Sequence, residues 1–230
     1  MPQQLLRSIS LRTFNLTRVL QLTTVLLMLF ISTSALAHHP MGGKTPSNFV
    51  EGFLSGVAHP VIGFDHFAFI VAVGLLAATK RQGILIAIAF VLSAMVGTGL
   101  HLMGVSLLGA ELLISGSVLL FGILLVLKDS PNTLLIMALA ALAGMCHGYA
   151  YGEAIFGASM VPLLAYLLGF TVIQMGITTS VMMLSQSLSQ RKDASQMSFK
   201  IRFAGFVLCG IGAAFFSSQL IDTILPTLNN

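Results

Sequence analysis

Long apolar runs separated by short polar segments constrain the fold of this chain more than any other feature of its sequence. A helix needs roughly 20 apolar residues to cross the hydrocarbon core of a bilayer, and six runs reach or approach that length: residues 64–79, 84–103, 107–127, 133–149, 159–184 and 203–220. With 56% hydrophobic and only 8% charged residues, the chain has too little polar surface for a water-soluble globule. We therefore predict an all-α fold, a polytopic membrane bundle of six transmembrane helices in the lipid bilayer.

The first of these spans is expected to be broken near its outer end. The run 64–79 is short for a span, but a half-helix over residues 49–58 supplies the missing length if the chain breaks at Pro60 and Gly63. Proline lacks the backbone N–H of a helix bond, and glycine permits unusual dihedral angles. A broken helix at membrane depth is tolerated only where it faces protein or a water-filled cavity, so we expect the break to lie at a functional site.

The first 37 residues have the layout of a secretory signal peptide. Basic residues come first, then a short apolar run over residues 19–31, and then small residues that end at Ala37. We predict cleavage after Ala37; the alternative is an uncleaved signal anchor that adds one helix. Residues 38–48 then form a flexible external leader, whose His38 and His39 either meet a passing cation or have no role, and residues 49–230 form the transmembrane domain.

The basic residues predict which side of the membrane each loop faces. With the mature N-terminus outside, only Lys44 lies on the external side; the basic residues on the cytoplasmic side are Lys80, Arg81, Lys128, Arg191, Lys192, Lys200 and Arg202. This bias agrees with the signal peptide. We therefore predict a multi-pass protein of the cytoplasmic (inner) membrane of a bacterium, with both termini external and residues 191–202 as a cytoplasmic loop.

Charge and cysteine content argue against two other kinds of protein. The formal net charge of +4 falls to about +1 when Arg7, Arg12 and Arg18 leave with the signal peptide, so no basic surface for nucleic acid remains. Cys146 and Cys209 both lie inside apolar runs, which argues against a disulfide framework. For Cys146, a small packing residue is the simpler interpretation.

The octet from His59 to His66 (HPVIGFDH) places two imidazoles and a carboxylate where the first span breaks. A charged group at the centre of a membrane helix costs roughly 2.5–3.5 kcal/mol, so such groups mark functional pathways. The break can bring His59 toward Asp65 and His66, and backbone carbonyls freed there could add oxygen ligands. The alternative is that Asp65 caps the helix that begins nearby, with both histidines at the membrane interface.

A second group of polar residues closes the fourth span. His147 and Tyr151 are four residues apart and share a helix face, while Gly148 and Gly152 let another helix approach closely. His147 and Glu153 are candidate metal ligands. The alternative is that Tyr151 and its neighbouring tyrosine are interfacial aromatics and that Glu153 sits in a loop.

In the predicted topology, the buried ionisable groups gather toward the external face. We expect them to form an outward-facing vestibule of imidazole and carboxylate groups that suits a borderline divalent ion such as nickel, cobalt, zinc or copper(II). The candidate metal ligands are His59, Asp65, His66, His147, Glu153 and Glu111. Glu111 and Ser115 either extend this vestibule or mark a helix N-terminus favoured by the macrodipole, and His101 is interpreted as a packing residue.

One further polar stripe lies on the fifth span. Thr171, Gln174 and Thr178 share one helix face. They either line the inner half of a path across the membrane or make hydrogen bonds between helices.

Together, the octet His-Pro-x-x-Gly-x-Asp-His after a signal peptide and the later His-Gly-x-Ala-x-Gly-Glu segment resemble the HupE/UreJ family of nickel permeases found beside hydrogenase and urease systems. The resemblance implies uptake of nickel, with cobalt as a substitute, for metalloenzyme maturation, and metal ligands at His59, Asp65 and His66. It implies no resident cofactor, and hydrogenase or urease maturation proteins as downstream partners; a homo-oligomer is left open. The family pattern often has a second histidine at the position of Tyr151.

We expect a secondary transporter and not an enzyme. The sequence has no Walker pattern for ATP coupling, and the membrane potential favours cation entry by about 2.3 kcal/mol per charge per 100 mV. One alternative is an intramembrane metal-dependent hydrolase that holds catalytic zinc with the same side chains, although no HExxH or nucleophile elbow is present. Another is a metal-binding accessory module whose N-terminal histidines deliver the ion to a partner.

Overall fold

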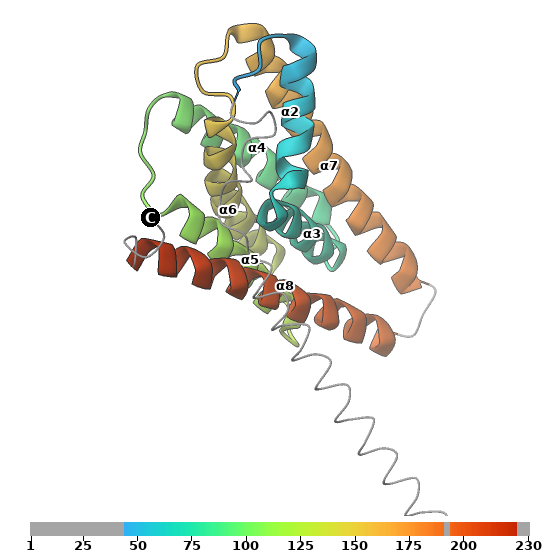
Figure 1. The fold of residues 1–230 in the computed structure, drawn as a ribbon. Helices are drawn as coiled ribbons and strands as arrows, with labels where there is room; N and C mark the ends of the chain where they lie inside the picture. The colour runs from blue at the N-terminus through green and yellow to red at the C-terminus, as the bar shows by residue number, and fades with distance from the viewer. Residues whose placement is uncertain (1–43, 191–193, 225–230) are drawn as a thin grey trace, which may run out of the picture.

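The computed structural model describes residues 44–190 and 194–224 and consists, over these residues, entirely of helices and connecting loops. The predicted all-α fold is therefore confirmed. The helices are α2 (Phe49–Ile62), α3 (Phe64–Ala78), α4 (Gly83–Leu102), α5 (Ala110–Val126), α6 (Thr133–Glu153), α7 (Met160–Gln190) and α8 (Ala194–Ile224) (Figure 1). The predicted signal peptide, His38 and His39 lie outside the described residues.

Each of the six predicted apolar runs contains a helix, and most of these helices are long enough to cross a membrane. Among the described residues, α4, α6, α7 and α8 are sufficiently long and apolar, α2 and α3 together qualify as one bent span, and α5 is a shorter apolar helix of 17 residues. The outward faces carry large apolar side chains that are half exposed or more, as lipid contact requires: Leu92, Val96, Leu142, Leu164, Val172 and Met183. The count of six spans stays a prediction, because α5 is short.

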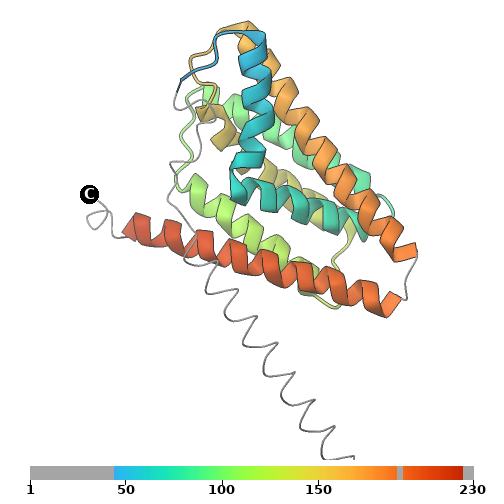
Figure 2. The ribbon, with the colours of Figure 1, turned by 45° about the vertical axis from the view of Figure 1, so that its right-hand side comes forward.

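The first span is broken as predicted, but the break lies later than expected. α2 continues past residue 58 and contains Pro60, because a proline removes only one helix hydrogen bond, here the bond to the Gly56 carbonyl. The helix ends at Gly63, whose ψ of 99° is extended. α3 then leaves α2 at an angle of 79° (Figure 2).

Two other helix ends differ from the sequence-based expectation. α6 continues to Glu153, so this residue ends the helix and does not lie in the following loop. α8 begins at Ala194, so residues 194–202 are helical and not a loop. Packing of α6 on α4 extends α6 past its glycines, because tertiary contacts override weak local propensity.

Three helix pairs are in close contact through glycines. A methyl carbon added at Gly148 would lie 1.9 Å from the Ala94 carbonyl oxygen, which fixes α6 against α4. The same test at Gly56 gives 2.2 Å to the Tyr166 carbonyl oxygen, between α2 and α7, and at Gly122 gives 2.6 Å to a backbone nitrogen of α8. Small residues are what allow membrane helices to approach this closely, so the predicted role of Gly148 is confirmed.

Helix α3 lies at the centre of these pairs. It contacts all six other described helices, and ten of its fifteen residues are buried. The 79° break directs its N-terminal turn into the protein interior, so Asp65 and His66 are buried. A half-helix that begins inside the bundle can present its first residues to a buried site.

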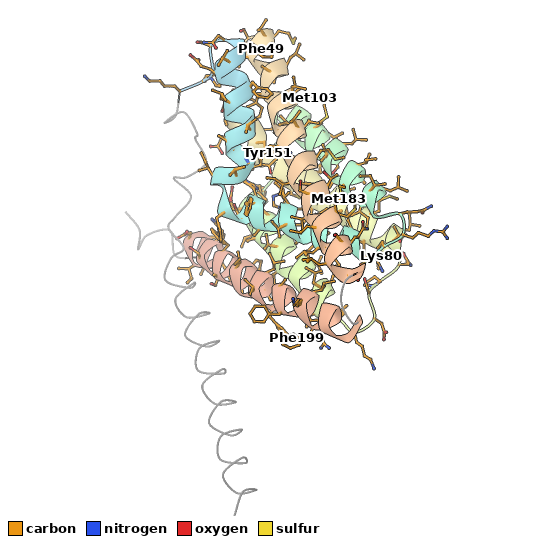
Figure 3. All side chains as sticks on the ribbon, turned by 90° about the vertical axis from the view of Figure 1, so that its right-hand side faces the viewer. Phe49, Lys80, Met103, Tyr151, Met183 and Phe199 are labelled. Carbon is orange, nitrogen blue, oxygen red and sulfur yellow. The ribbon has the colours of Figure 1, made fainter. Side chains whose placement is uncertain are left out.

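Two loops with basic residues meet at one end of the molecule. Lys80 Nζ donates to the carbonyl oxygen of Ser130 at 3.3 Å, which brings the loop after α3 beside the loop after α5. Figure 3 shows Lys80 and Phe199 toward this end, Phe49 toward the opposite end, and Tyr151 between them. The side of the membrane that this end faces stays a prediction.

Candidate metal site

Three histidines from three helices meet in the buried centre of the bundle. His59 comes from the end of α2, His66 from the first turn of α3 and His147 from α6, and none is more than 1% exposed. The ring centroids of His59 and His66 are 5.7 Å apart, and those of His66 and His147 are 4.9 Å apart. The two sequence motifs thus converge on one site.

Ser117 on α5 determines which nitrogen of His147 carries the hydrogen. The Ser117 hydroxyl donates to the Ile114 carbonyl at 2.6 Å, and its oxygen lies 2.9 Å from His147 Nε2. A hydroxyl has a single hydrogen, so a neutral His147 must donate its Nε2–H to Ser117. The lone pair of His147 is therefore on Nδ1, which faces His66 Nδ1 at 2.7 Å.

Tyr166 on α7 orients His59 by the same logic. Its hydroxyl donates to the Tyr151 carbonyl at 2.8 Å and lies 3.0 Å from His59 Nδ1. Because the phenol hydrogen is already used, His59 must donate its Nδ1–H to the tyrosine oxygen. The lone pair of His59 is then on Nε2.

Each of the three rings therefore combines a bonded N–H with one unprotonated nitrogen. His66 donates its Nδ1–H to His147 and carries its lone pair on Nε2. A neutral imidazole whose N–H is held by an oxygen is the form in which histidine ligates metals. Ser117 and Tyr166 provide this support for His147 and His59.

The glycine at the break makes room for the His66 ring. Gly63 has φ −68° and ψ 99°, which any residue can adopt. A methyl carbon at this position would lie 2.5 Å from His66 Cδ2. Gly63 is therefore needed for the close approach of an imidazole and not for its backbone conformation.

Asp65 brings a carboxylate to the start of α3. It is 5% exposed, and its Oδ1 accepts a hydrogen bond from the His66 backbone N–H at 2.8 Å. This contact satisfies one of the free N–H groups of a helix N-terminus, which is the helix-terminal role considered from sequence, although Gly63 and not Asp65 is the N-cap.

Tyr151 fills the space between the histidines. It is fully buried, with ring centroids 5.0 Å from His59 and 4.8 Å from His66. It is thus a core residue of the site and not an interfacial aromatic.

The comparison of sequences identifies the family. A sequence model described as HupE / UreJ protein matches residues 26–215, which cover most of the chain. The chain belongs to the HupE/UreJ family. The family comprises membrane proteins associated with nickel or cobalt transport and is not a known enzyme family. Searches of curated proteins and of solved structures gave no match.

In this HupE/UreJ protein, the three histidines and Asp65 are buried and not exposed to an open vestibule. Aromatic rings close the site: Phe69 stacks on His147 at 4.3 Å, and Phe170 packs on Tyr151 at 5.6 Å between centroids. The expected outward-facing vestibule is therefore closed around the histidines in this conformation.

The remaining predicted residues lie at helix ends. Glu153 is exposed at the end of α6, and Glu111 is partly buried in the first turn of α5. The Ser115 hydroxyl donates to the Glu111 carbonyl at 2.8 Å. His101 packs on the Tyr149 ring at 4.6 Å, as expected for a packing histidine.

Sequence reasoning missed Ser117 and Tyr166. Each is a polar side chain within an apolar run, and neither belongs to a motif. Their partners His147 and His59 are 30 and 107 residues away in the chain. A search for isolated hydroxyls in apolar runs would have found both as candidates, without their partners.

Proposed function

We propose that this HupE/UreJ protein is a secondary transporter that carries a divalent transition-metal ion, nickel or cobalt, across the cytoplasmic membrane into the cell. His59, Asp65, His66 and His147 bind the ion in transit. The observation that carries the proposal is the meeting of three buried, oriented imidazoles at the break of a membrane helix. Such nitrogen donors suit borderline divalent ions.

The imidazole and carboxylate donors fit the ion, and the spacing of the histidine rings indicates that the site must rearrange to bind it. Among the described residues, no three His, Cys, Asp or Glu side chains are grouped to hold a metal. The His147 Nδ1 lone pair accepts the Nδ1–H of His66 at a distance of 2.7 Å, whereas a metal needs about 2.0–2.1 Å to a histidine nitrogen and room for its other ligands. Binding therefore requires the His66 and His147 rings to separate.

Capture also breaks a hydrogen bond. His66 donates its Nδ1–H to His147 Nδ1, and a metal that binds this His147 nitrogen takes the place of that donor, so His66 keeps its hydrogen and loses its acceptor. The Asp65 carboxylate lowers the unfavourable energy of a positive ion in this apolar surrounding. A site that must be rearranged to bind, and that is re-formed on release, suits a transported ion better than a resident cofactor.

The direction of transport follows from the predicted topology. With the mature N-terminus outside, Glu153 and Glu111 attract the cation from the external side, and the membrane potential favours its entry. The ion then serves metalloenzyme maturation in the cytoplasm, with hydrogenase or urease maturation proteins as the receiving partners. His38 and His39 add a further external capture point.

Metal entry into liposomes tests this proposal. The purified protein is reconstituted, and entry of Ni²⁺ or Co²⁺ is followed for the wild type and for His59→Ala, Asp65→Ala, His66→Ala and His147→Ala. We expect entry in the wild type and a loss of at least about tenfold in each variant, since each removes a ligand or its charge. His101→Ala is the matched control, because this histidine packs at another site.

Two outcomes would contradict the proposal. Entry that is unchanged in all four variants would remove the site assignment. No entry in the wild type, together with hydrolysis of a lipid or peptide, would favour the metal-dependent hydrolase.

A further inference from the structure

Two polar side chains on α7 are buried without hydrogen bonds in the apolar interior. Gln174 and Thr178 are both 0% exposed. Within residues 44–190 and 194–224, the Gln174 amide nitrogen and oxygen and the Thr178 hydroxyl have no hydrogen-bond partner. The hydrogen bonds between helices considered from sequence for this stripe are therefore not formed by these two side chains.

The Thr178 hydroxyl does not bond to its own helix, as several other hydroxyls in these helices do. Several threonine and serine hydroxyls donate to the carbonyl four residues earlier in their own helix, namely those of Thr98, Ser115, Thr179 and Thr223. Thr178 makes no such bond, although its neighbour Thr179 bonds the Met175 carbonyl at 2.6 Å. The Thr178 hydroxyl is thus available to another partner.

An unsatisfied buried polar group costs about 1–3 kcal/mol, and native proteins usually pair such groups with protein, water or an ion. Here an amide and a hydroxyl lie four residues apart on one helix face. Thr171, half-buried on the same side, has a hydroxyl that also lacks a hydrogen-bond partner among the described residues. The three side chains together have enough donors and acceptors for ordered water.

The position of these side chains connects them to the histidine site. Tyr166, Phe170, Gln174 and Thr178 recur every four residues along α7, and all four are fully buried. Tyr166 contacts His59. At a rise of 1.5 Å per residue, Gln174 lies about 12 Å and Thr178 about 18 Å further along the helix.

This direction leads toward the end of the molecule with the basic loops. Figure 3 places Met183 of α7 between Tyr151 and Lys80. Helix α3 packs against this part of α7, because a methyl carbon added at Gly74 of α3 would lie 2.8 Å from the Thr178 carbonyl oxygen. The Gln174–Thr178 pair thus lies in the part of α7 that packs closely on the central helix.

One apolar side chain, that of Phe170, lies between the two polar sites along α7. The Phe170 ring lies 5.6 Å from Tyr151 and 5.8 Å from Tyr166, between their centroids. Phe170 also lies between Tyr166 and Gln174 on the same helix face. Hydrophobic constrictions gate some membrane pathways, and the position of Phe170 between the two sites is suited to such a constriction.

We propose that Gln174 and Thr178, with Thr171 beside them, form an inner polar station that holds water and, during transport, the hydration shell of the divalent cation. The inference rests on the proposed function and extends it toward the cytoplasmic side. Neutral amide and hydroxyl groups hold a hydrated ion more weakly than imidazole and carboxylate. The histidine site therefore captures the ion, and the inner station passes it on.

Water at the station is tested without transport, by cysteine labelling. In a Cys146→Ala/Cys209→Ala background, Gln174→Cys, Thr178→Cys and Thr179→Cys are treated with a small, water-soluble methanethiosulfonate reagent. Only the thiolate reacts, and thiolates form where water is present, so we expect positions 174 and 178 to react at least about tenfold faster than position 179. Equal, slow reaction at all three positions would overturn the inference, whether or not the protein transports metal.

A second experiment separates passage from capture. Gln174→Leu and Thr178→Val remove the polar groups at nearly constant volume, and Thr179→Val is the matched control. We expect unchanged equilibrium binding of Ni²⁺ to the protein in detergent and a fall in liposome entry of about tenfold or more, equivalent to the loss of about 1.4 kcal/mol of stabilisation in transit.

The outcomes for the two claims are distinct. Metal entry in both Gln174→Leu and Thr178→Val at the rate of the wild type and of the Thr179→Val control would overturn the inference and leave the proposed function intact. Lost binding in these variants would place them in the capture site and also contradict a separate station. A wild type that neither binds nor admits metal would refute the proposed function, and the cysteine rates would then decide whether the water site exists.

Discussion

At the scale of single residues, the histidine site depends on side chains that are not ligands. Ser117 and Tyr166 each donate their only hydrogen to a backbone carbonyl, so each can only accept from a histidine. This arrangement fixes where His147 and His59 carry their lone pairs. Support of this kind commonly changes metal affinity by 10–100-fold.

Ser117→Ala is expected to weaken Ni²⁺ binding by about 10–100-fold, because the Nε2–H of His147 loses its acceptor and the ring is no longer held in one tautomer. Ser117→Thr keeps the hydroxyl and should restore most of the affinity. Equilibrium dialysis in detergent measures the change. Ser217→Ala is the control, since Ser217 also bonds a carbonyl three residues earlier but contacts no histidine in the described structure; equal losses in Ser117→Ala and Ser217→Ala would contradict the assignment.

From the sequence, the buried histidines could be predicted to lie near one another, but the residues that support them could not. Membrane burial makes histidines and carboxylates conspicuous, so His59, Asp65, His66 and His147 could be selected, and the structure brings them to one region. Ser117 and Tyr166 are common residue types whose role depends on long-range contacts. Glu153 and Glu111 stay predictions as ligands, because they lie at helix ends where charged residues also occur for local reasons.

At the scale of elements, the break between α2 and α3 positions the residues of the histidine site. It places the end of one half-helix and the start of another beside each other, with His59 and His66 on either side of Gly63. The sequence predicted this break from Pro60 and Gly63. It could not predict that α2 continues through Pro60, because one missing hydrogen bond is offset by the packing of α2 on α7.

Gly63→Ala should reduce metal affinity while the protein stays folded. Alanine accepts the backbone angles of this position, but its methyl group meets the fully buried His66 ring. Overpacking of about 1–3 kcal/mol corresponds to about 5- to 150-fold in affinity. Binding and thermal unfolding are measured together with Gly176→Ala, where an added methyl group has open space; an unchanged affinity in Gly63→Ala would show that the ring can move freely.

The contact between α4 and α6 gives a prediction about stability. In Gly148→Ala the new methyl group would meet the Ala94 backbone at 1.9 Å, so the helices must separate. We expect destabilisation of about 1–3 kcal/mol or more, seen as a lower unfolding temperature in detergent. Gly116→Ala is the control, because its nearest neighbour is a phenylalanine ring at 3.6 Å; a similar temperature shift in both variants would contradict the packing argument.

At the scale of the whole molecule, three close helix pairs surround α3 and bring the site residues together. His59 belongs to the α2–α7 pair, His147 to the α4–α6 pair and Ser117 to the α5–α8 pair. A relative movement of any pair would therefore change the spacing of the ligands. This arrangement suits an ion that is captured and released, since the His66–His147 pair must separate to bind and can close again.

X-ray absorption of the Ni²⁺-loaded protein tests the central claim most directly. We expect scattering from at least two imidazole rings in the wild type, a lower imidazole contribution in His147→Ala, and no site-bound nickel in His59→Ala/His66→Ala/His147→Ala. Site-bound nickel with the same imidazole signal in this triple variant would show that other residues hold the ion, and would contradict the account.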